Sequence, residues 1–487
     1  MKKSVSIKKN FIMESILTMS TFIFPLITFP YVSRVLGPDG NGKVSFATAL
    51  VSYFNIIAQL GIPRYGIRAC AQVRDDPEEL TRTAHELLII NLIMSSIAYV
   101  LFFIALAFVP RLQGEKPLYI IISATLLLNT IGMEWLYKAM EQYTYITVRS
   151  IIFKFVALLA MFALVRSKKD YVAYGAISIL AASASNVFNF FHAHRYIRMR
   201  PIGGYNLGRH MKAVLVFFAM ACATTIYTQL DTLMLGFMKP DADVGYYHAA
   251  VRIKSILVSI VTSLGTVLLP RASYYVKQGN SEAFERITRK ALNFVVLFAA
   301  PLTLYFILFA RQGIFLLSGT AYAGAIQPMQ IIMPTLLFIG LSNITGIQIL
   351  VPTGREKVVL YSEIVGALVD VVINALLIPR YASSGAAFGT LVAEGVVLGW
   401  QYRVLHDELK GALGSIQYGK IALALVLGAA ASLASLKLGL GIFFTLVVSA
   451  VLFFGVYGGI ILLTKEPLSL ELLEQMKQMV VNRLKKR

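Results

Sequence analysis

The feature that most constrains this chain is a series of apolar runs, each about 20 residues long, that recurs from one end to the other. A helix of about 20 apolar residues crosses the hydrocarbon core of a bilayer. The runs predict an all-α integral membrane protein with about fourteen spans. The predicted spans lie near residues 11–34, 43–62, 85–109, 117–137, 144–165, 171–191, 213–238, 247–270, 291–310, 326–352, 358–379, 385–402, 418–438 and 442–463.

Composition supports a membrane location and argues against several other classes. The chain is 57% hydrophobic and 14% charged, with a mean hydropathy of +0.70, whereas soluble domains carry about 25% charged residues. The two cysteines, Cys70 and Cys222, are too few and too far apart to suggest a disulfide or a metal site. No Walker motif, metal-ligand cluster or nucleotide-binding glycine loop is present, so we expect no cofactor and no ATP hydrolysis.

The net charge of +20 has a topological explanation. With a cytoplasmic N-terminus, the even-numbered connections and the two tails hold roughly 31 of the 45 Lys and Arg residues, which is the positive-inside bias. We therefore expect a multi-pass membrane protein with both termini in the cytoplasm. Some basic residues are expected to contact lipid head groups, and no nucleic-acid partner is expected.

The stretch from Thr21 to Arg68 consists of two apolar runs joined by a glycine-rich hinge at residues 37–42 (GPDGNG). The same plan returns near Pro240, Asp241 and Gly245. Such duplication predicts two pseudo-symmetric lobes of six helices each, which in membranes usually bracket a central path. The predicted divisions are an N-lobe at 1–200, a C-lobe at 201–410, and two further helices with a basic tail at 411–487; the small residues at 428–435 suit close helix packing.

Several motifs resemble one family. Residues 29–38 (FPYVSRVLGP) with 42–47 (GKVSFA), 60–68 (LGIPRYGIR), and 132–137 (GMEWLY) followed by 141–143 (EQY) are similar to the bacterial oligosaccharide flippases. These form the polysaccharide-transporter branch of the multidrug/oligosaccharidyl-lipid/polysaccharide exporter superfamily. The likeness is specific over about the first 150 residues and architectural beyond them.

The resemblance implies a function and a set of partners. It implies alternating-access movement of an oligosaccharide, linked to a lipid of the undecaprenyl pyrophosphate type, from the inner to the outer leaflet for surface polysaccharide synthesis. The implied cavity lies between V-shaped lobes. A polysaccharide polymerase and glycosyltransferases are the candidate protein partners.

Polar side chains within the spans form three stripes at helical spacing. Such stripes either line a cavity or hold helices together; the charged residues Arg252 and Glu14 favour lining. The stripes are Arg252, Ser255, Ser259, Thr262, Ser263 and Thr266; Ser45, Thr48, Ser52, Asn55 and Gln59; and Glu14, Thr18, Thr21 and Thr28.

A pyrophosphate needs positive charge, and Arg252 is the first candidate because its guanidinium can bind phosphate in a bidentate way. Four other basic residues are secondary candidates, and for each the alternative is an interfacial anchor. The predicted substrate-binding set is Arg252, Arg34, Arg64, Arg149, Lys154, Glu14 and Ser259.

Acidic residues suggest a coupling ion. Glu363, Asp370 and Asn374 lie at i, i+7 and i+11, and Asp231 lies in an earlier span. In the peptidoglycan-lipid flippases of the superfamily, similar residue types hold sodium, so the resemblance implies Na+ or H+ coupling at Asp231, Asp370 and Asn374, with Glu363 nearby. The alternatives are buried hydrogen bonding or pairing with Arg252.

Two other function classes compete with the flippase. A cation-coupled multidrug exporter of the same superfamily would favour acidic and aromatic walls, and the basic candidates argue against it. A membrane glycosyltransferase or polymerase needs a large loop or an acid–base pair at a membrane face. The outward connections are too short for such a domain, so we expect a transporter and not an enzyme.

Overall fold

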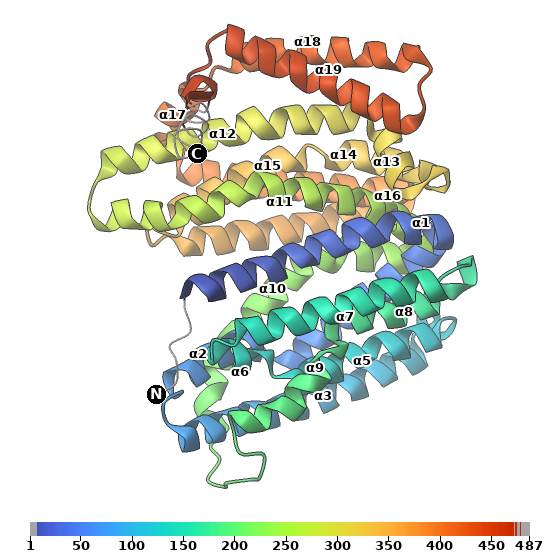
Figure 1. Cartoon of the computed structure of the whole chain (residues 1–487), viewed down its shortest axis with the longest axis vertical. Helices are drawn as coiled ribbons and strands as arrows, with labels where there is room; N and C mark the ends of the chain where they lie inside the picture. Colours follow the sequence, from blue (N-terminus) through green and yellow to red (C-terminus); the bar gives the residue numbers. More distant parts are fainter. Residues whose placement is uncertain (1–6, 472, 475–477, 479–487) are drawn as a thin grey trace, which may run out of the picture. The chain divides into compact units, whose positions relative to one another are not determined.

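Helices are the only regular secondary structure among the residues that the computed structural model describes, which are 7–471, 473–474 and 478 (Figure 1). This confirms the all-α class, and it follows from the need of a backbone in lipid to satisfy its own hydrogen bonds. The side chains of residues 7, 8, 22 and 264–267 are outside the description, so Thr266 of the predicted stripe is too. The chain divides into two compact units, Met1–Gly245 and Tyr246–Arg487, which are described separately.

The first unit begins with a long helix that is really two. Helix α1 (Ile7–Gln59) is interrupted at Gly37, whose φ of 68° and ψ of −178° are not helical. Glycine adopts such a conformation without the strain of a side chain. The remaining elements are α2 (Ile62–Gln72), α3 (Pro77–Phe108), α4 (Pro110–Gln113), α5 (Lys116–Gly132), α6 (Glu134–Ala139), α7 (Tyr143–Leu164), η1 (Lys168–Asp170), α8 (Tyr171–Ile179), η2 (Leu180–Ala184), α9 (Asn186–His192), η3 (Ala193–Arg195) and α10 (Gly208–Met238).

The core of the first unit lies where α2, α3, α6 and α10 meet. Ile62, Leu87, Leu136 and Val214 are all completely buried there. Gly61, at the junction of α1 and α2, lets α10 approach closely, because a Cβ at this position would lie 2.4 Å from the backbone nitrogen of Phe218. Helix α10 is thereby packed against the end of α1, where the polar side chains described below gather.

The second unit also contains a doubled helix. Helix α16 (Glu356–Val404) is interrupted at Ala382, which has φ 47° and ψ −126°. The predicted span at 326–352 is broken into α14 (Ile326–Ile332), α15 (Thr335–Asn343) and η5 (Ile344–Leu350), with Pro334 at the break because proline lacks the backbone donor. The other elements are α11 (Asp241–Lys277), whose first five residues belong to the first unit, α12 (Ser281–Leu308), α13 (Ala310–Ser318), η4 (Thr320–Ala325), α17 (His406–Gly414), α18 (Tyr418–Leu433), η6 (Ala434–Leu438) and α19 (Ile442–Leu463).

Helices α18 and α19 form a hairpin that packs on α12. The Tyr457 hydroxyl of α19 donates to the backbone oxygen of Leu297 at 2.8 Å, and the Tyr305 hydroxyl of α12 donates to that of Leu446 at 2.9 Å. At Gly428 a Cβ would lie only 3.0 Å from the oxygen of Phe453. The close packing expected of the small residues at 428–435 is therefore present at this position.

Within the described residues, ten helices are long and apolar enough to cross a membrane, or twelve if each of two bent pairs is one span. This count of spans is lower than the predicted fourteen. Two of the ten, Lys9–Gln72 and Glu356–Val404, each contain two of the predicted runs, separated at Gly37 and at Ala382. The internal symmetry and the lobe boundaries at 200 and 410 stay predictions; by packing, α10 belongs to the unit that ends at residue 245.

Candidate functional site

Four asparagines and one arginine of the first unit form a connected set, which we call the amide chain: Asn55, Asn129, Asn186, Arg149 and Asn189. The Asn129 Nδ2 donates to Asn55 Oδ1 at 3.3 Å, and Asn186 Nδ2 donates to Asn129 Oδ1 at 3.2 Å. The Arg149 guanidinium donates to Asn186 Oδ1 at 3.3 Å and also to Asn189 Oδ1. Five side chains from α1, α5, α7 and α9 are thus joined across the interior of the unit.

A tight turn between α5 and α6 supports this chain. The Asn189 Nδ2 donates to the backbone oxygen of Gly132 at 2.7 Å. The next residue, Met133, is fully buried and has φ 39° and ψ 40°, a left-handed conformation that is uncommon for a residue other than glycine. Strained backbone of this kind collects at functional sites, and here it places Glu134 and Trp135 directly beside the amide chain.

Two cavities adjoin the amide chain and share Asn55, Gln59 and Pro63. One has a volume of about 210 Å³ and the other about 240 Å³. The first is also lined by Asn129, Glu134, Trp135, Lys138 and Asn186, and the second by Ile56, Gly61, Arg64, Phe217, Ala221, Thr224 and Thr225.

Charged side chains surround these cavities. Lys138 lies 3.0 Å from a carboxylate oxygen of Glu134 and 4.0 Å from one of Glu14. Arg149 is buried, with 8% of its surface exposed, and its guanidinium lies 5.7 Å from the ring centre of Tyr145. Arg64 is exposed at the wall of the larger cavity. The site therefore combines neutral amides with cations and with the Glu134 carboxylate at its wall.

This arrangement suits binding and not bond cleavage. An asparagine or glutamine offers an acceptor oxygen and two donors, so a row of amides can hydrogen-bond sugar hydroxyls, which are both donors and acceptors. Arginine and lysine bind phosphate oxygens through charge-assisted hydrogen bonds. In the part of the chain that the structure describes, no group of three His, Cys, Asp or Glu side chains could hold a metal ion.

The structure brings several predicted substrate residues of the first unit to this region. Arg149 belongs to the amide chain, Arg64 lines a cavity, and Glu14 reaches Lys138. Lys154 donates to Ser20 Oγ at 2.7 Å, next to the same packing of α7 on α1. Arg34 lies elsewhere; it is exposed and donates to the backbone oxygen of Pro30 at 2.7 Å.

Five residues of the site were missed by the sequence reasoning: Asn129, Glu134, Lys138, Asn186 and Asn189. A signal was available, because three asparagines within or at the ends of predicted spans are polar groups that a bilayer penalises. The motif at 132–137 also contains Glu134 and Trp135.

Arg252 and Ser259 lie on α11 in the second unit. Arg252 is half-buried, one helical turn after His248. The hydroxyls of the predicted stripe donate to their own helix: Ser259 donates to the backbone oxygen of Ser255 at 2.8 Å, and Thr262 to that of Val258 at 2.9 Å. A substrate role for Arg252 and Ser259 stays a prediction.

Of the predicted cation-coupling residues, Asp370 and Asn374 come together. Both are buried, and a Cβ added to Gly389 would lie 2.9 Å from Asp370 Oδ1 and 2.2 Å from Asn374 Oδ1. Glu363 is exposed and does not join them in the buried interior. Asp231 is buried in α10 of the first unit, close enough to interact electrostatically with Tyr53 of α1. Ion coupling at these residues stays a prediction.

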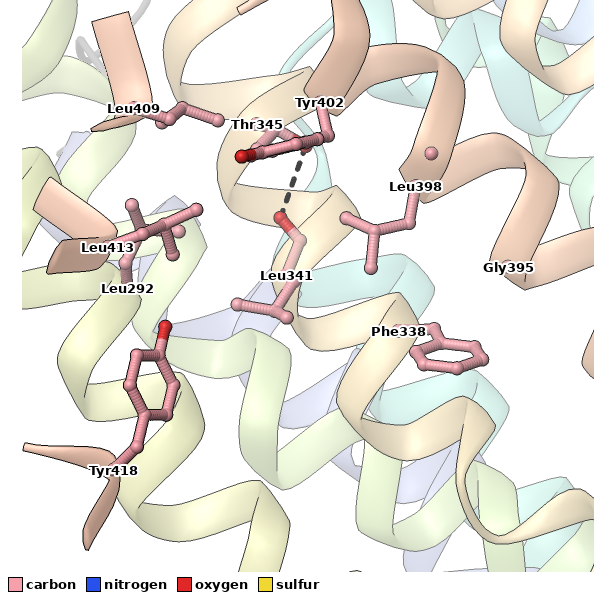
Figure 2. Close-up of a pocket in the computed structure, with 11 residues that line it drawn as sticks. Leu292, Phe338, Leu341, Thr345, Gly395, Leu398, Tyr402, Leu409, Leu413 and Tyr418 are labelled. Carbon is pink, nitrogen blue, oxygen red and sulfur yellow. Dashed lines mark hydrogen bonds between the residues drawn. The ribbon is translucent and has the colours of Figure 1, made fainter. Parts of the chain in front are cut away.

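The second unit contains a cavity of a different kind. It has a volume of about 350 Å³, and Figure 2 shows Leu341, Leu398 and Leu413 projecting toward it from three different helices. The Tyr418 ring, at the start of α18, forms part of its wall, and the only hydrogen bond drawn joins Thr345 to the backbone of Leu341 at 3.2 Å. This cavity suits an apolar chain.

Comparison with known proteins decides the family. The model of the family described as "Polysaccharide biosynthesis protein" matches residues 7–276, more than half of the chain. The chain belongs to this family. The family described as "MatE" matches residues 217–376, so the chain lies within the multidrug/oligosaccharidyl-lipid/polysaccharide exporter superfamily that the motifs indicated.

Individual relatives agree with this assignment. The chain is 23% identical over 395 residues, 81% of its length and 95% of the relative, to a "Putative O-antigen transporter" of Escherichia coli (strain K12). Its fold is similar to that of "Lipid II flippase MurJ, inward closed conformation", with a TM-score of 0.71, 14% identity and coverage of 92% of this chain and 99% of the other. The fold is also similar to that of a multidrug resistance MATE family transporter in an inward-facing conformation, with a TM-score of 0.60 and 16% identity. This match covers 82% of this chain and 99% of the other.

Proposed function

We propose that this polysaccharide biosynthesis protein is a flippase that moves oligosaccharide repeat units, linked to a polyprenyl pyrophosphate, from the inner to the outer leaflet by alternating access. It is a transporter and not an enzyme, in agreement with the names of its O-antigen relatives. We place it in the bacterial cytoplasmic membrane with both termini in the cytoplasm. Its product would supply surface polysaccharide synthesis, with glycosyltransferases before it and a polymerase after it.

The observation that carries the proposal is the amide chain with its neighbouring cations. The Asn55, Asn129 and Asn186 amides border a cavity whose wall also contains Lys138. Amides recognise sugar hydroxyls without adding charge, while Lys138 and Arg64 can face the pyrophosphate. A cargo that is an uncharged or weakly charged sugar joined to a strongly charged phosphate needs both kinds of group at one site.

The apolar cavity of the second unit supports a lipid-linked cargo. A polyprenyl chain is hydrocarbon, and the leucines of Figure 2 offer it contacts that require no hydrogen bonds. A soluble sugar would gain nothing from such a cavity.

Transport by charge-neutralising variants tests the proposal. Full-length protein in proteoliposomes is assayed for flipping of a short-chain polyprenyl pyrophosphate oligosaccharide. Arg64→Gln removes an exposed charge and is expected to lower flipping about fivefold, the effect of about 1 kcal/mol. Lys138→Gln is expected to lower it about tenfold or more, because Lys138 is partly buried and its loss also releases Glu134.

The matched control is Lys169→Gln, which removes an exposed charge at η1 outside both cavities. Wild-type flipping in the Arg64 and Lys138 variants would contradict the proposed site, as would an equal loss in the control. Absence of flipping by the wild-type protein, with cationic drug transport instead, would contradict the proposed function.

The second candidate is a cation-coupled multidrug exporter. It is favoured by the MatE match over residues 217–376 and by the buried pair of Asp370 and Asn374. Two measurements in a sensitive host distinguish the candidates. An exporter confers drug resistance and leaves surface polysaccharide unchanged, whereas a flippase restores surface polysaccharide and confers no drug resistance.

A further inference from the structure

A further cavity lies in the first unit, beneath the connection from η3 to α10. It has a volume of about 240 Å³ and is separate from the two cavities of the amide chain. Its walls are mainly apolar: Leu88, Ile89 and Leu92 come from one face of α3, Phe190 from α9, and Ile197 and Met199 from the connection. Nothing in the proposed transport path uses this cavity.

The cavity is a built feature, because hydrogen bonds fix the connection that covers it. His85 of α3 bonds the Tyr205 hydroxyl at 3.0 Å through Nδ1 and the backbone oxygen of Arg198 at 2.7 Å through Nε2. The backbone nitrogen of Asn206 donates to Glu86 Oε1 at 2.7 Å, and Glu86 itself is completely buried.

The cavity lies at the end of an apolar band. Along α3, Leu92 is 41% exposed, and exposed apolar side chains continue from it to Phe108. The first turns of the same helix carry the charged residues Glu78, Glu79 and Arg82. The transition from charged to apolar surface marks the level of lipid head groups, so the cavity opens where acyl chains begin.

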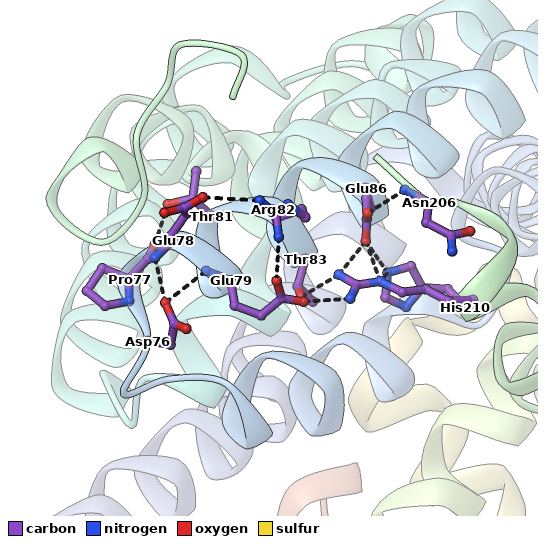
Figure 3. A network of polar contacts seen from close by, with 11 residues as sticks. Asp76, Pro77, Glu78, Glu79, Thr81, Arg82, Thr83, Glu86, Asn206 and His210 are labelled. Atoms are coloured by element: carbon purple, nitrogen blue, oxygen red, sulfur yellow. Dashed lines mark hydrogen bonds and ion pairs between the residues drawn. The ribbon is translucent and has the colours of Figure 1, made fainter. Parts of the chain in front are cut away.

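Uncompensated positive charge lies above the opening. Figure 3 shows that Arg82 is engaged by Glu78 and Glu79, and the row of carboxylates continues to Glu86, which accepts from His210 at 2.7 Å. Arg209 is likewise bound, to Glu79 and Glu86. In contrast, Arg195, Arg198 and Arg200 are exposed, and none of the three makes an ion pair with the described residues.

We propose that this cavity is a binding site for an anionic phospholipid of the leaflet that borders the 196–207 connection. Part of one acyl chain occupies the cavity against Leu88 and Leu92, and the phosphate lies at Arg198 and Arg200. Basic pockets beside membrane helices on the cytoplasmic side bind anionic head groups in this way. Such a lipid would tie α3 to the connection that leads into α10, a helix of the amide-chain site.

Native mass spectrometry of the full-length protein in detergent tests this proposal, with phosphatidylglycerol and phosphatidylcholine of identical acyl chains as probes. Wild-type protein is expected to bind phosphatidylglycerol more tightly. The double variant Arg198→Gln/Arg200→Gln is expected to lose roughly 25-fold in phosphatidylglycerol affinity, from about 1 kcal/mol per arginine at a membrane surface. Its phosphatidylcholine affinity is expected to fall less, because the choline cation already offsets the charge of the phosphate. Leu88→Trp fills the cavity and is expected to weaken both lipids.

The matched control is Arg166→Gln/Lys169→Gln, which removes two exposed charges from the 165–170 connection, away from this cavity. Equal affinity for the two lipids, or an equal loss in the control, would overturn the proposal. Displacement of phosphatidylglycerol by a polyprenyl phosphate at the same concentration would assign the cavity to the transported lipid and overturn it too. Binding of free glycerol phosphate as tightly as the intact lipid would show that the acyl chain contributes nothing to affinity, and it would also overturn the proposal.

Discussion

Replacing Asn129 with Leu tests whether the amide chain is a working unit. The two side chains have the same number of heavy atoms and the same branching, so the change removes polarity with little change of shape. Asn129 makes three side-chain hydrogen bonds, to Asn55 at 3.3 Å, Asn186 at 3.2 Å and Ser183 at 3.0 Å. At about 0.5–1.5 kcal/mol each, their full loss would cost about 1.5–4.5 kcal/mol.

We expect Asn129→Leu to lower the free energy of unfolding by about 2 kcal/mol, near the lower end of this range. Asn129 is half-buried and borders a cavity where water can replace some of its hydrogen-bond partners. Flipping in proteoliposomes should fall at least tenfold, since Asn55 and Asn186 lose the partner that orients them both. Stability is measured by thermal unfolding in detergent, and flipping is measured per folded molecule.

The matched control is Tyr99→Phe, which removes the hydrogen bond from the tyrosine hydroxyl to the backbone oxygen of Ser123 at 2.8 Å, between α3 and α5. It should lower stability slightly and leave flipping intact. Normal flipping by Asn129→Leu, or an equal loss of flipping in the control at matched stability, would refute a direct role of the amide chain in transport.

Four further predictions concern particular residues. Arg252→Ala should abolish surface polysaccharide while membrane expression persists, and Arg252→Lys should restore only part of it because lysine lacks the bidentate guanidinium; full activity of the Ala variant would exclude a substrate role for Arg252. Ala382→Gly should raise the thermal unfolding temperature, since relief of about 1–3 kcal/mol of backbone strain at φ 47° exceeds the added chain entropy; a lower temperature would contradict the strained turn. Burial would raise the pKa of Glu466, but hydrogen bonds from the Ser469 backbone and Asn293 outweigh it and hold the pKa below its ordinary 4.5. The contribution of the ionised Glu466 to stability is therefore complete above pH 4.5 and lost as pH falls through the lowered pKa. Unfolding curves of Glu466→Gln should lack this loss. Asp370→Asn should remove any dependence of flipping on a sodium or proton gradient, and an unchanged dependence would exclude Asp370 as the coupling residue.

The sequence predicted the helical class and most span positions because apolar runs of bilayer length leave a backbone no other solution. It also marked the hinge at Gly37, where glycine is a visible signal for a non-helical residue. The break at Ala382 falls between the predicted spans at 358–379 and 385–402, so the apolar runs also marked this position. They did not mark the residue that leaves the helical conformation, because alanine itself favours helix.

The candidate site was predicted only in part, and helix geometry explains why. Arg149 stood out as a charge in a span, whereas its partners Asn186 and Asn189 follow the π-helical segment η2. A π-bulge inserts an extra residue in the turn and rotates every later side chain relative to a regular helix. Helical spacing counted through 171–191 therefore places these asparagines on the wrong face, and only the folded chain brings them to Arg149.

Two energy sources for the proposed transport, the membrane potential and a sodium gradient, predict different results. A potential that is negative inside acts on an anion in the outward direction and supplies about 2.3 kcal/mol per charge per 100 mV. The pyrophosphate of the proposed cargo would therefore be driven outward by the potential itself. Cations such as Arg149 and Lys138 would serve to offset its desolvation and not to move it against the field. A potassium diffusion potential without sodium should then accelerate flipping in wild-type protein and in Asp370→Asn alike. If the buried Asp370 and Asn374 bind the coupling ion, a sodium gradient at zero potential should act only on the wild type.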